Sequence, residues 1–128
     1  VPVTDDGRYV LVHQYRFPLD GRLLEFPAGT LEPGEAPGGT IRRELEEETG
    51  YRAEHIAELG RFPLAPGYSD EYIHAFLATG LTPLARPPAQ DADEDLETVL
   101  LDATELEAAM REGRVDAKSM AAYILLPD

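Results

Sequence analysis

One short segment, residues 41–49, restricts the possible folds of this chain more than any other. Its sequence is Ile-Arg-Arg-Glu-Leu-Glu-Glu-Glu-Thr, and the apolar residues have the spacing of a helix that packs one side against a core. At about 100° per residue, Glu44, Glu47 and Glu48 share an arc of roughly 100°. Ile41 and Leu45 lie beside that arc. The fold must therefore bury one side of this helix and keep three carboxylates crowded next to the buried side.

The two ends of this helix are less regular than its middle. Gly50 follows at the position where a glycine commonly ends a helix. On the side away from the core, Arg42 and Glu46 are one turn apart, and we expect them to pair in solvent. Gly38 and Gly39 would each cost about 1 kcal/mol in a helix interior. Either the helix starts after them, or Gly38 packs closely against the core side.

The crowded carboxylates have two interpretations. Like charges one turn apart on a helix destabilise it by a few tenths of a kcal/mol per pair, and an apolar neighbourhood adds a desolvation cost. A bound divalent cation reverses that cost, because hard cations prefer oxygen ligands. The alternative is an acidic helix face that is simply solvated. Only Arg43 stands at the edge of the arc to neutralise it.

The rest of the chain predicts an α/β fold in a single domain, residues 1–128, with a mixed sheet and helices packed on it. We expect loops at 28–39, 66–71 and 81–95, where Gly, Pro and acidic residues gather. The helix after the last strand is expected to begin with Thr104 as its N-cap. The predicted strands are 8–15, 23–26, 56–64, 72–77 and 98–101, and the further helices are 104–111 and 117–126.

Composition excludes several classes of function. The chain has no cysteine, so disulfides, thiolate catalysis and zinc–thiolate sites are excluded. The formal net charge is −14, and without a basic cluster we expect no nucleic-acid partner. No apolar stretch approaches the roughly 20 residues of a membrane span. The sequence starts at Val1, close to a strand, so we expect that an N-terminal arm is missing from it.

The segment around the helix resembles the Nudix box of the Nudix hydrolase family. That pattern is Gly, five residues, Glu, seven residues, Arg-Glu-apolar, one residue, Glu-Glu, one residue, Gly-apolar, and every defined position is met. The matching residues are Gly29, Glu35, Arg43, Glu44, Leu45, Glu47, Glu48, Gly50 and Tyr51.

The resemblance implies an α/β/α sandwich in which the box forms a loop–helix–loop motif. It further implies that Glu44, Glu47 and Glu48 hold two or three Mg²⁺ or Mn²⁺ ions, with Glu47 and Arg43 among the catalytic residues. Arg43 would orient a carboxylate through charge-assisted hydrogen bonds.

Three residues of the preceding loop also have roles under this resemblance. Gly29 would let the loop bend beside the substrate, and its neighbour Ala28 would offer a backbone carbonyl oxygen to a metal. Glu35 would either order the loop or support the metal ligands.

Features outside the box resemble the ADP-ribose pyrophosphatases in particular. They are Gln14-Tyr15-Arg16, the run 24–29 before the box, and Pro66 with the following residues up to Glu71. Arg16 would hold a phosphate or ribose through forked hydrogen bonds; the alternative is a surface arginine at a strand end. Tyr15 or Tyr68 would stack on adenine, or else only pack locally. Glu71 would contact the ribose or support the metal site.

Hydrolysis also needs a base that activates water. In the resembling enzymes it comes from a late loop, and the acidic run 91–97 has that place here. We expect Glu94 to be the base, with Asp93 as the second choice; the alternative is a solvated acidic loop. The three histidines, His13, His55 and His74, are isolated, and we expect them to be structural.

These observations predict hydrolysis of ADP-ribose to AMP and ribose 5-phosphate. One alternative is a broader nucleoside diphosphate sugar hydrolase with substrates of the GDP-mannose or NADH type. Another is a non-catalytic nucleotide-binding module on the same fold. From the resemblance we also expect a homodimer, and the absence of cysteine fits a cytoplasmic location.

Overall fold

The computed structural model of the chain describes residues 1–85 and 96–128. Two antiparallel sheets form its framework. In the first, β1 (Tyr9–Arg16) lies between β2 (Gly21–Glu25) and β5 (Leu96–Leu101). The second is a long hairpin of β3 (Tyr51–Pro63) and β4 (Tyr72–Pro83). The short 3₁₀ helix η1 (Phe17–Leu19) links β1 to β2.

The N-terminal segment joins the two sheets. The Val3 amide donates to the Ala78 carbonyl of β4, and the Val10 amide of β1 donates to the Pro2 carbonyl. The bridge of Pro2 to Ala78 is parallel, whereas all pairs between the named strands are antiparallel. Among the described residues, a second parallel bridge joins Leu24 to Val115, so the mixed character of the predicted sheet comes from single bridges and not from a full parallel strand.

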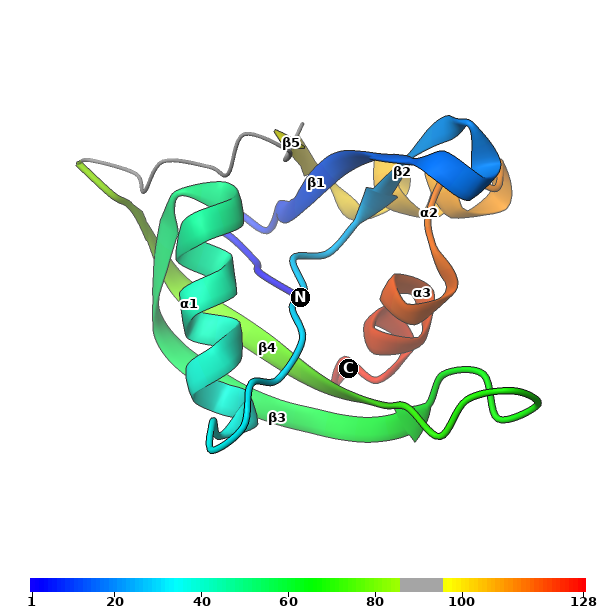
Figure 1. Ribbon diagram of the computed structural model, residues 1–128. Coiled ribbons are helices and arrows are strands. Elements are labelled where there is room, and N and C mark those ends of the chain that lie inside the picture. Colours follow the sequence, from blue (N-terminus) through cyan, green and yellow to red (C-terminus); the bar gives the residue numbers. More distant parts are fainter. Residues whose placement is uncertain (86–95) are drawn as a thin grey trace.

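Helices lie on both sides of this framework (Figure 1). On one side is α1 (Pro37–Thr49), and on the other are α2 (Ala103–Arg111) and α3 (Ala117–Ile124). The larger core cluster includes Leu11, Leu24, Phe26 and Leu106. A smaller cluster holds Leu45 of α1 against the β3–β4 hairpin. Fully burying one such side chain contributes about 1.5–3 kcal/mol, so these contacts fix α1 against the sheets.

Several predicted boundaries are wrong for identifiable reasons. α1 begins at Pro37, so the interpretation that the helix starts after the two glycines fails. A side-chain carbon built on Gly38 meets nothing within 4 Å, so close packing does not explain that glycine either. The N-cap of α2 is Asp102, which forms a capping box with Glu105, and not Thr104.

The β3–β4 hairpin is longer than predicted at both strands. β3 starts directly after Gly50, and β4 continues to Pro83, into the stretch predicted as loop. Many residues of both strands are only partly buried, so the apolar alternation that marks a strand is weak there. The register shifts between Glu58 and Gly60, where Gly60 has a positive φ of 152°, as expected for a glycine at a bulge.

Candidate active site

The helix α1 presents its carboxylates next to its buried side, as the spacing predicts. Leu45 is 2% exposed and anchors the helix in the core. Gly50 ends it in the left-handed conformation, with φ of 74° and its N–H donated to the Glu46 carbonyl. The predicted Arg42–Glu46 pair does not form. Arg42 instead donates to the Ala53 carbonyl.

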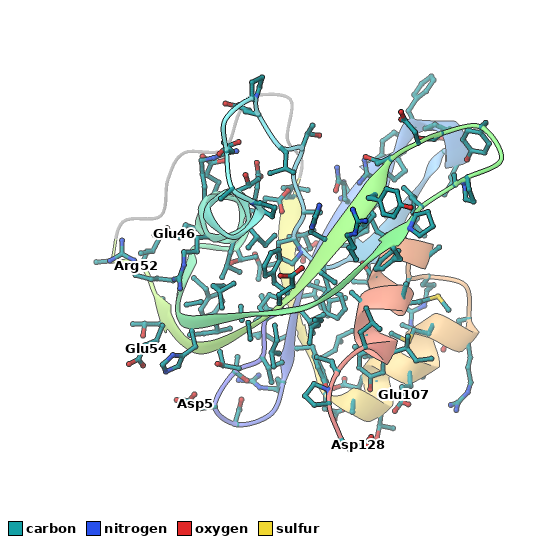
Figure 2. The ribbon with its side chains drawn as sticks, turned by 90° about the horizontal axis from the view of Figure 1, so that it is seen from below. Asp5, Glu46, Arg52, Glu54, Glu107 and Asp128 are labelled. Carbon is teal, nitrogen blue, oxygen red and sulfur yellow. The ribbon has the colours of Figure 1, made fainter. Side chains whose placement is uncertain are left out.

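Glu46 pairs with a residue of the next strand instead. Its Oε1 accepts from Arg52 Nε at 3.2 Å, and Figure 2 shows the two side chains together at the outer surface. Because the chain turns sharply at Gly50, the start of β3 runs back beside the end of α1. Arg52 of the strand therefore pairs with Glu46 in place of Arg42, and helical spacing alone does not reveal this pairing.

Arg43 donates hydrogen bonds to three carboxylates, those of Glu35, Glu44 and Glu47. We call these four residues the Arg43 cluster. Its Nη1 donates to Glu44 Oε1 at 3.0 Å and to Glu47 Oε2 at 3.4 Å. Its Nη2 reaches both oxygens of Glu35, at 3.3 and 3.4 Å. One guanidinium therefore partly neutralises the helix carboxylates and ties them to the loop.

Glu35 also orders its own loop. Its Oε1 accepts from the Glu32 backbone N–H at 2.9 Å. This bond is the main reason that the pKa of Glu35 lies below its usual value; partial burial opposes the shift, and Arg43 adds to it. A carboxylate that is held ionised in this way keeps both the loop and Arg43 in place. The loop-ordering role expected for Glu35 agrees with these contacts.

The loop that follows β2 meets α1 at two points. The Ala28 backbone N–H donates to Glu48 Oε2 at 3.0 Å. A side-chain carbon built on Gly29 would lie under 3.0 Å from Cγ, Cδ and Oε1 of Glu44. Gly29 does not have a positive φ, so the backbone bend is not the reason for a glycine there. The reason is the close approach of the Glu44 carboxylate, which corrects the sequence-based interpretation.

These contacts decide how the predicted metal ligands lie. Glu44 and Glu47 are bonded to Arg43, and Glu48 is bonded to Ala28. Within residues 1–85 and 96–128, no three acidic or histidine side chains converge closely enough to hold a metal as they stand. The donors are nevertheless all oxygen atoms on two adjoining elements, which is the ligand type that Mg²⁺ and Mn²⁺ prefer.

A second charged group, the Lys118 network, lies where β1, β2 and the start of α3 meet. It consists of Arg16, Glu25, Asp116 and Lys118. The Glu25 side chain is only 3% exposed and accepts two bonds of 2.7 Å from Arg16, at Nε and Nη2. Lys118 Nζ donates to Glu25 Oε1 and to Asp116 Oδ2, each at 2.8 Å. The network joins residues 93 positions apart in the sequence.

Burial and charge oppose each other in this network. Burial raises the pKa of Glu25, but the bonds from Arg16 and Lys118 outweigh it, so that pKa lies below its usual value. Burial lowers the pKa of Lys118, and Asp116 and Glu25 more than offset that effect. The pKa of Arg16 is raised, mainly by its bond to Glu25 and in part by the charge of Glu48. All three groups are therefore charged at neutral pH, close to the carboxylates of α1.

A cavity of about 290 Å³ lies between the loop after β2, the start of α1, β4 and α3. Most of its wall is apolar. The lining includes Ala28 and Gly29 at the box, Glu71 before β4, and Lys118 of α3. The cavity thus adjoins both the loop that bonds to Glu48 and the Lys118 network, as expected for a site that binds a small charged molecule.

The structure places the other candidate residues as follows. Arg16 is committed to Glu25, although its side chain is 42% exposed. Tyr15 donates from its hydroxyl to Asp20 Oδ1 at 2.7 Å, and Tyr68 is 91% exposed. Glu71 lines the cavity. Glu94 and Asp93 lie outside the described residues.

Lys118 was not identified as a site residue from the sequence. One signal for it existed: it is the only lysine of the 128 residues. The histidines differ in surroundings. His74 lines the cavity, whereas His13 and His55 are each 4.0 Å from a glutamate oxygen.

The sequence profile of the NUDIX domain matches residues 1–123. The chain belongs to the Nudix family. Nudix hydrolases generally use divalent metal ions, in keeping with the oxygen-rich site described above. A solved structure, the crystal structure of an ADP compounds hydrolase, superposes with a TM-score of 0.84 at 26% sequence identity, and the match covers 98% of this chain and 66% of that one. The predicted α/β/α Nudix fold is thereby confirmed.

Among curated relatives, an ADP-ribose pyrophosphatase of Bacillus subtilis is 45% identical over 97 residues, which are 76% of this chain and 52% of that protein. A methanol dehydrogenase activator of Bacillus methanolicus is 40% identical over 123 residues, covering 95% of this chain and 66% of the relative. A GDP-mannose pyrophosphatase of Yersinia enterocolitica is 35% identical over 123 residues, covering 90% and 64%. The chain thus spans about half to two thirds of the length of these relatives.

No helix within the described part of the chain has the length and apolar character needed to cross a membrane.

Proposed function

We propose that this Nudix protein hydrolyses the pyrophosphate bond of ADP-ribose, giving AMP and ribose 5-phosphate. The observation that carries the proposal is the junction of the box loop with α1, where Glu44 and Glu48 meet Gly29 and Ala28 beside the cavity. The similarity to ADP-ribose pyrophosphatases from two bacteria supports the choice of substrate.

In this proposal Glu44, Glu47, Glu48 and the Ala28 carbonyl oxygen hold two or three Mg²⁺ or Mn²⁺ ions. When bound, such ions lower the pKa of water and neutralise charge at phosphorus. Arg43 orients the carboxylates, because it already contacts two of them. It would keep part of the negative charge balanced while the ligands turn toward the cations.

The remaining assignments concern the substrate and the attacking water. Gly29 lines the cavity and binds the diphosphate beside Glu44. Tyr15 or Tyr68 stacks on the adenine, and both side chains are exposed enough to do so. Glu71 contacts the ribose from the cavity wall.

Arg16, which bonds to Glu25 but keeps 42% of its side chain exposed, holds a phosphate or the ribose of the substrate. Glu94, or else Asp93, takes the proton of the attacking water.

A test of the proposal is product analysis with purified protein, Mg²⁺ or Mn²⁺, and a panel of ADP-ribose, GDP-mannose, NADH and 8-oxo-dGTP. We expect ADP-ribose to be cleaved with the highest kcat/KM, and AMP and ribose 5-phosphate to appear in equal amounts. ADP-ribose as the poorest substrate of the panel would contradict the proposal.

The same panel tests a broader nucleoside diphosphate sugar hydrolase, which the similarity to a GDP-mannose pyrophosphatase favours. Comparable kcat/KM values for ADP-ribose and GDP-mannose would establish that alternative.

Replacing Glu48 by Gln separates an enzyme from a nucleotide-binding module. Glu48 lies on α1 and its carboxylate bonds to the box loop, so the amide would weaken a metal ligand without changing its size. We expect kcat to fall at least about 100-fold, because metal sites are sensitive to their ligands. A binding module would have no turnover to lose and would keep its ligand affinity. Arg111→Met on α2, away from the cavity, serves as the control.

We further propose that the protein is a cytoplasmic homodimer. Phe17 and Leu19 in the turn between β1 and β2 are 84% and 64% exposed, and large exposed apolar side chains favour association. Light scattering on the full-length protein tests this, and a monomer at micromolar concentration would refute it.

A further inference from the structure

The cavity contains one feature that the proposed metal site does not explain. It is the cationic side chain of Lys118, which is held by hydrogen bonds to Glu25 and Asp116. Among the described residues that line the cavity, Lys118 is the only lysine or arginine. It is also the only lysine in the sequence, which otherwise uses arginine for its basic residues. A diphosphate is an anion, and the facing helix carries several carboxylates, so a cation on the opposite wall has a clear electrostatic use.

The position of Lys118 is fixed by contacts on the side away from the cavity. Its ammonium group donates to Glu25 Oε1 and Asp116 Oδ2 at 2.8 Å each, and its side chain is 21% exposed. A lysine ammonium group has three N–H donors. Two are used by these bonds, so one can still reach an acceptor on the cavity side. Asp116 is itself fixed as the N-cap of α3, where it accepts from the Ser119 amide.

Glu25, which accepts a hydrogen bond from Lys118, is also bonded to a second cation, Arg16. Arg16 bonds to both oxygens of Glu25, so the two cations, Arg16 and Lys118, are balanced by the two carboxylates, Glu25 and Asp116. Of these four residues only Lys118 lines the cavity, so the network presents a positive charge to the cavity, whose lining also includes Ala28 and Gly29.

We propose that Lys118 is a specificity-determining residue whose ammonium group donates a hydrogen bond to a phosphate oxygen of a nucleoside diphosphate substrate bound in this cavity. This inference rests on the proposed hydrolysis and adds a residue to it from α3, outside the Nudix box. Lys118 holds the diphosphate from the side opposite to the α1 carboxylates, and Glu25 and Asp116 keep its side chain positioned before the substrate arrives.

The first experiment is steady-state kinetics with ADP-ribose on Lys118→Met and Lys118→Arg. Methionine keeps the length and removes the charge; arginine keeps the charge. A charge-assisted hydrogen bond contributes enough that its loss corresponds to roughly a 10- to 100-fold change in affinity. We expect KM to rise by that factor in Lys118→Met with a smaller change in kcat, and to recover at least in part in Lys118→Arg.

The control variant is Arg111→Met. It removes one positive charge from the exposed end of α2, which does not line the cavity. We expect its KM to stay within about twofold of wild type, since exposed charges act weakly at a distance. Thermal unfolding of all three variants shows whether each is folded, because Lys118→Met also removes one partner of the buried Glu25.

A second measurement needs no substitution. Protein labelled with ¹⁵N only at lysine contains one side-chain ammonium nitrogen, that of Lys118. We expect its resonance to shift and to exchange more slowly when the non-hydrolysable α,β-methylene analogue of ADP-ribose is added with Mg²⁺. The analogue without its distal ribose, α,β-methylene ADP, tests whether the diphosphate is sufficient for the shift.

The outcomes separate this inference from the proposed function. An unchanged KM in Lys118→Met, or an ammonium resonance that does not shift when the analogue binds, would overturn the role of Lys118. Neither result would contradict the proposed hydrolysis. A wild-type protein that neither binds the analogue nor cleaves any substrate of the panel would overturn both.

Discussion

The contact between Gly29 and Glu44 gives a sharp prediction, because one added methyl group tests the geometry of the carboxylates. In Gly29→Ala the new carbon would lie under 3.0 Å from three atoms of the Glu44 side chain. Carbon atoms in contact are about 3.5–4.0 Å apart, so the carboxylate must move by about 1 Å. The backbone needs no change, since the φ of Gly29 is not positive.

The expected effect on activity is much larger than the effect on stability. A ligand displaced by about 1 Å can cost 10²-fold in rate, and Mg²⁺ tolerates little variation in its ligand distances. We therefore expect kcat/KM for ADP-ribose to fall about 100-fold and the Mg²⁺ concentration for half-maximal activity to rise. Glu44 is a flexible side chain that can rotate away, so we expect a loss of stability of about 1 kcal/mol, the low end for added volume.

The assay is a titration of activity with Mg²⁺ and with Mn²⁺, together with urea unfolding. Gly38→Ala is the matched control: it makes the same chemical change in α1, at a position where the added carbon meets nothing within 4 Å. We expect it to keep full activity and to gain up to about 1 kcal/mol in stability. A Gly29→Ala protein with wild-type metal dependence and wild-type kcat/KM would refute the reasoning that the position of Glu44 matters.

Two further predictions concern stability. The pKa of Glu25 is lower in the folded protein than its ordinary value of 4.5, so its contribution is full above that pH and is lost as the pH falls through the lowered pKa. Glu25→Gln should therefore cost about 3 kcal/mol at pH 7, a low value for a broken buried pair because Arg16 can reach water. The difference from wild type should shrink in urea unfolding below about pH 4; a constant difference would contradict it. Asp102→Ala removes the capping box of α2 and should cost about 1 kcal/mol, whereas Thr104→Ala should be nearly neutral; equal losses in thermal unfolding would show that the cap is unimportant.

The sequence predicted the fold class and the central helix well for a local reason. Helical spacing alone puts Leu45 in the core and Glu44 and Glu48 beside it, and Gly50 ends the helix as expected. The long β3–β4 hairpin was predicted only in part. Its strands are held by pairing with each other more than by a buried face, and pairing partners are not visible in the pattern of a single strand.

What the sequence by itself determined is therefore local: which residues share the side of one helix, where that helix ends, and which family the box spacing resembles. Only the tertiary structure decided which charges meet. Glu46 pairs with Arg52 across a turn and not with Arg42 along the helix. Lys118 reaches Glu25 across 93 positions of sequence. Periodicity records the geometry of neighbours within one element, whereas contacts between elements depend on how distant segments pack, and that information is spread over the whole chain.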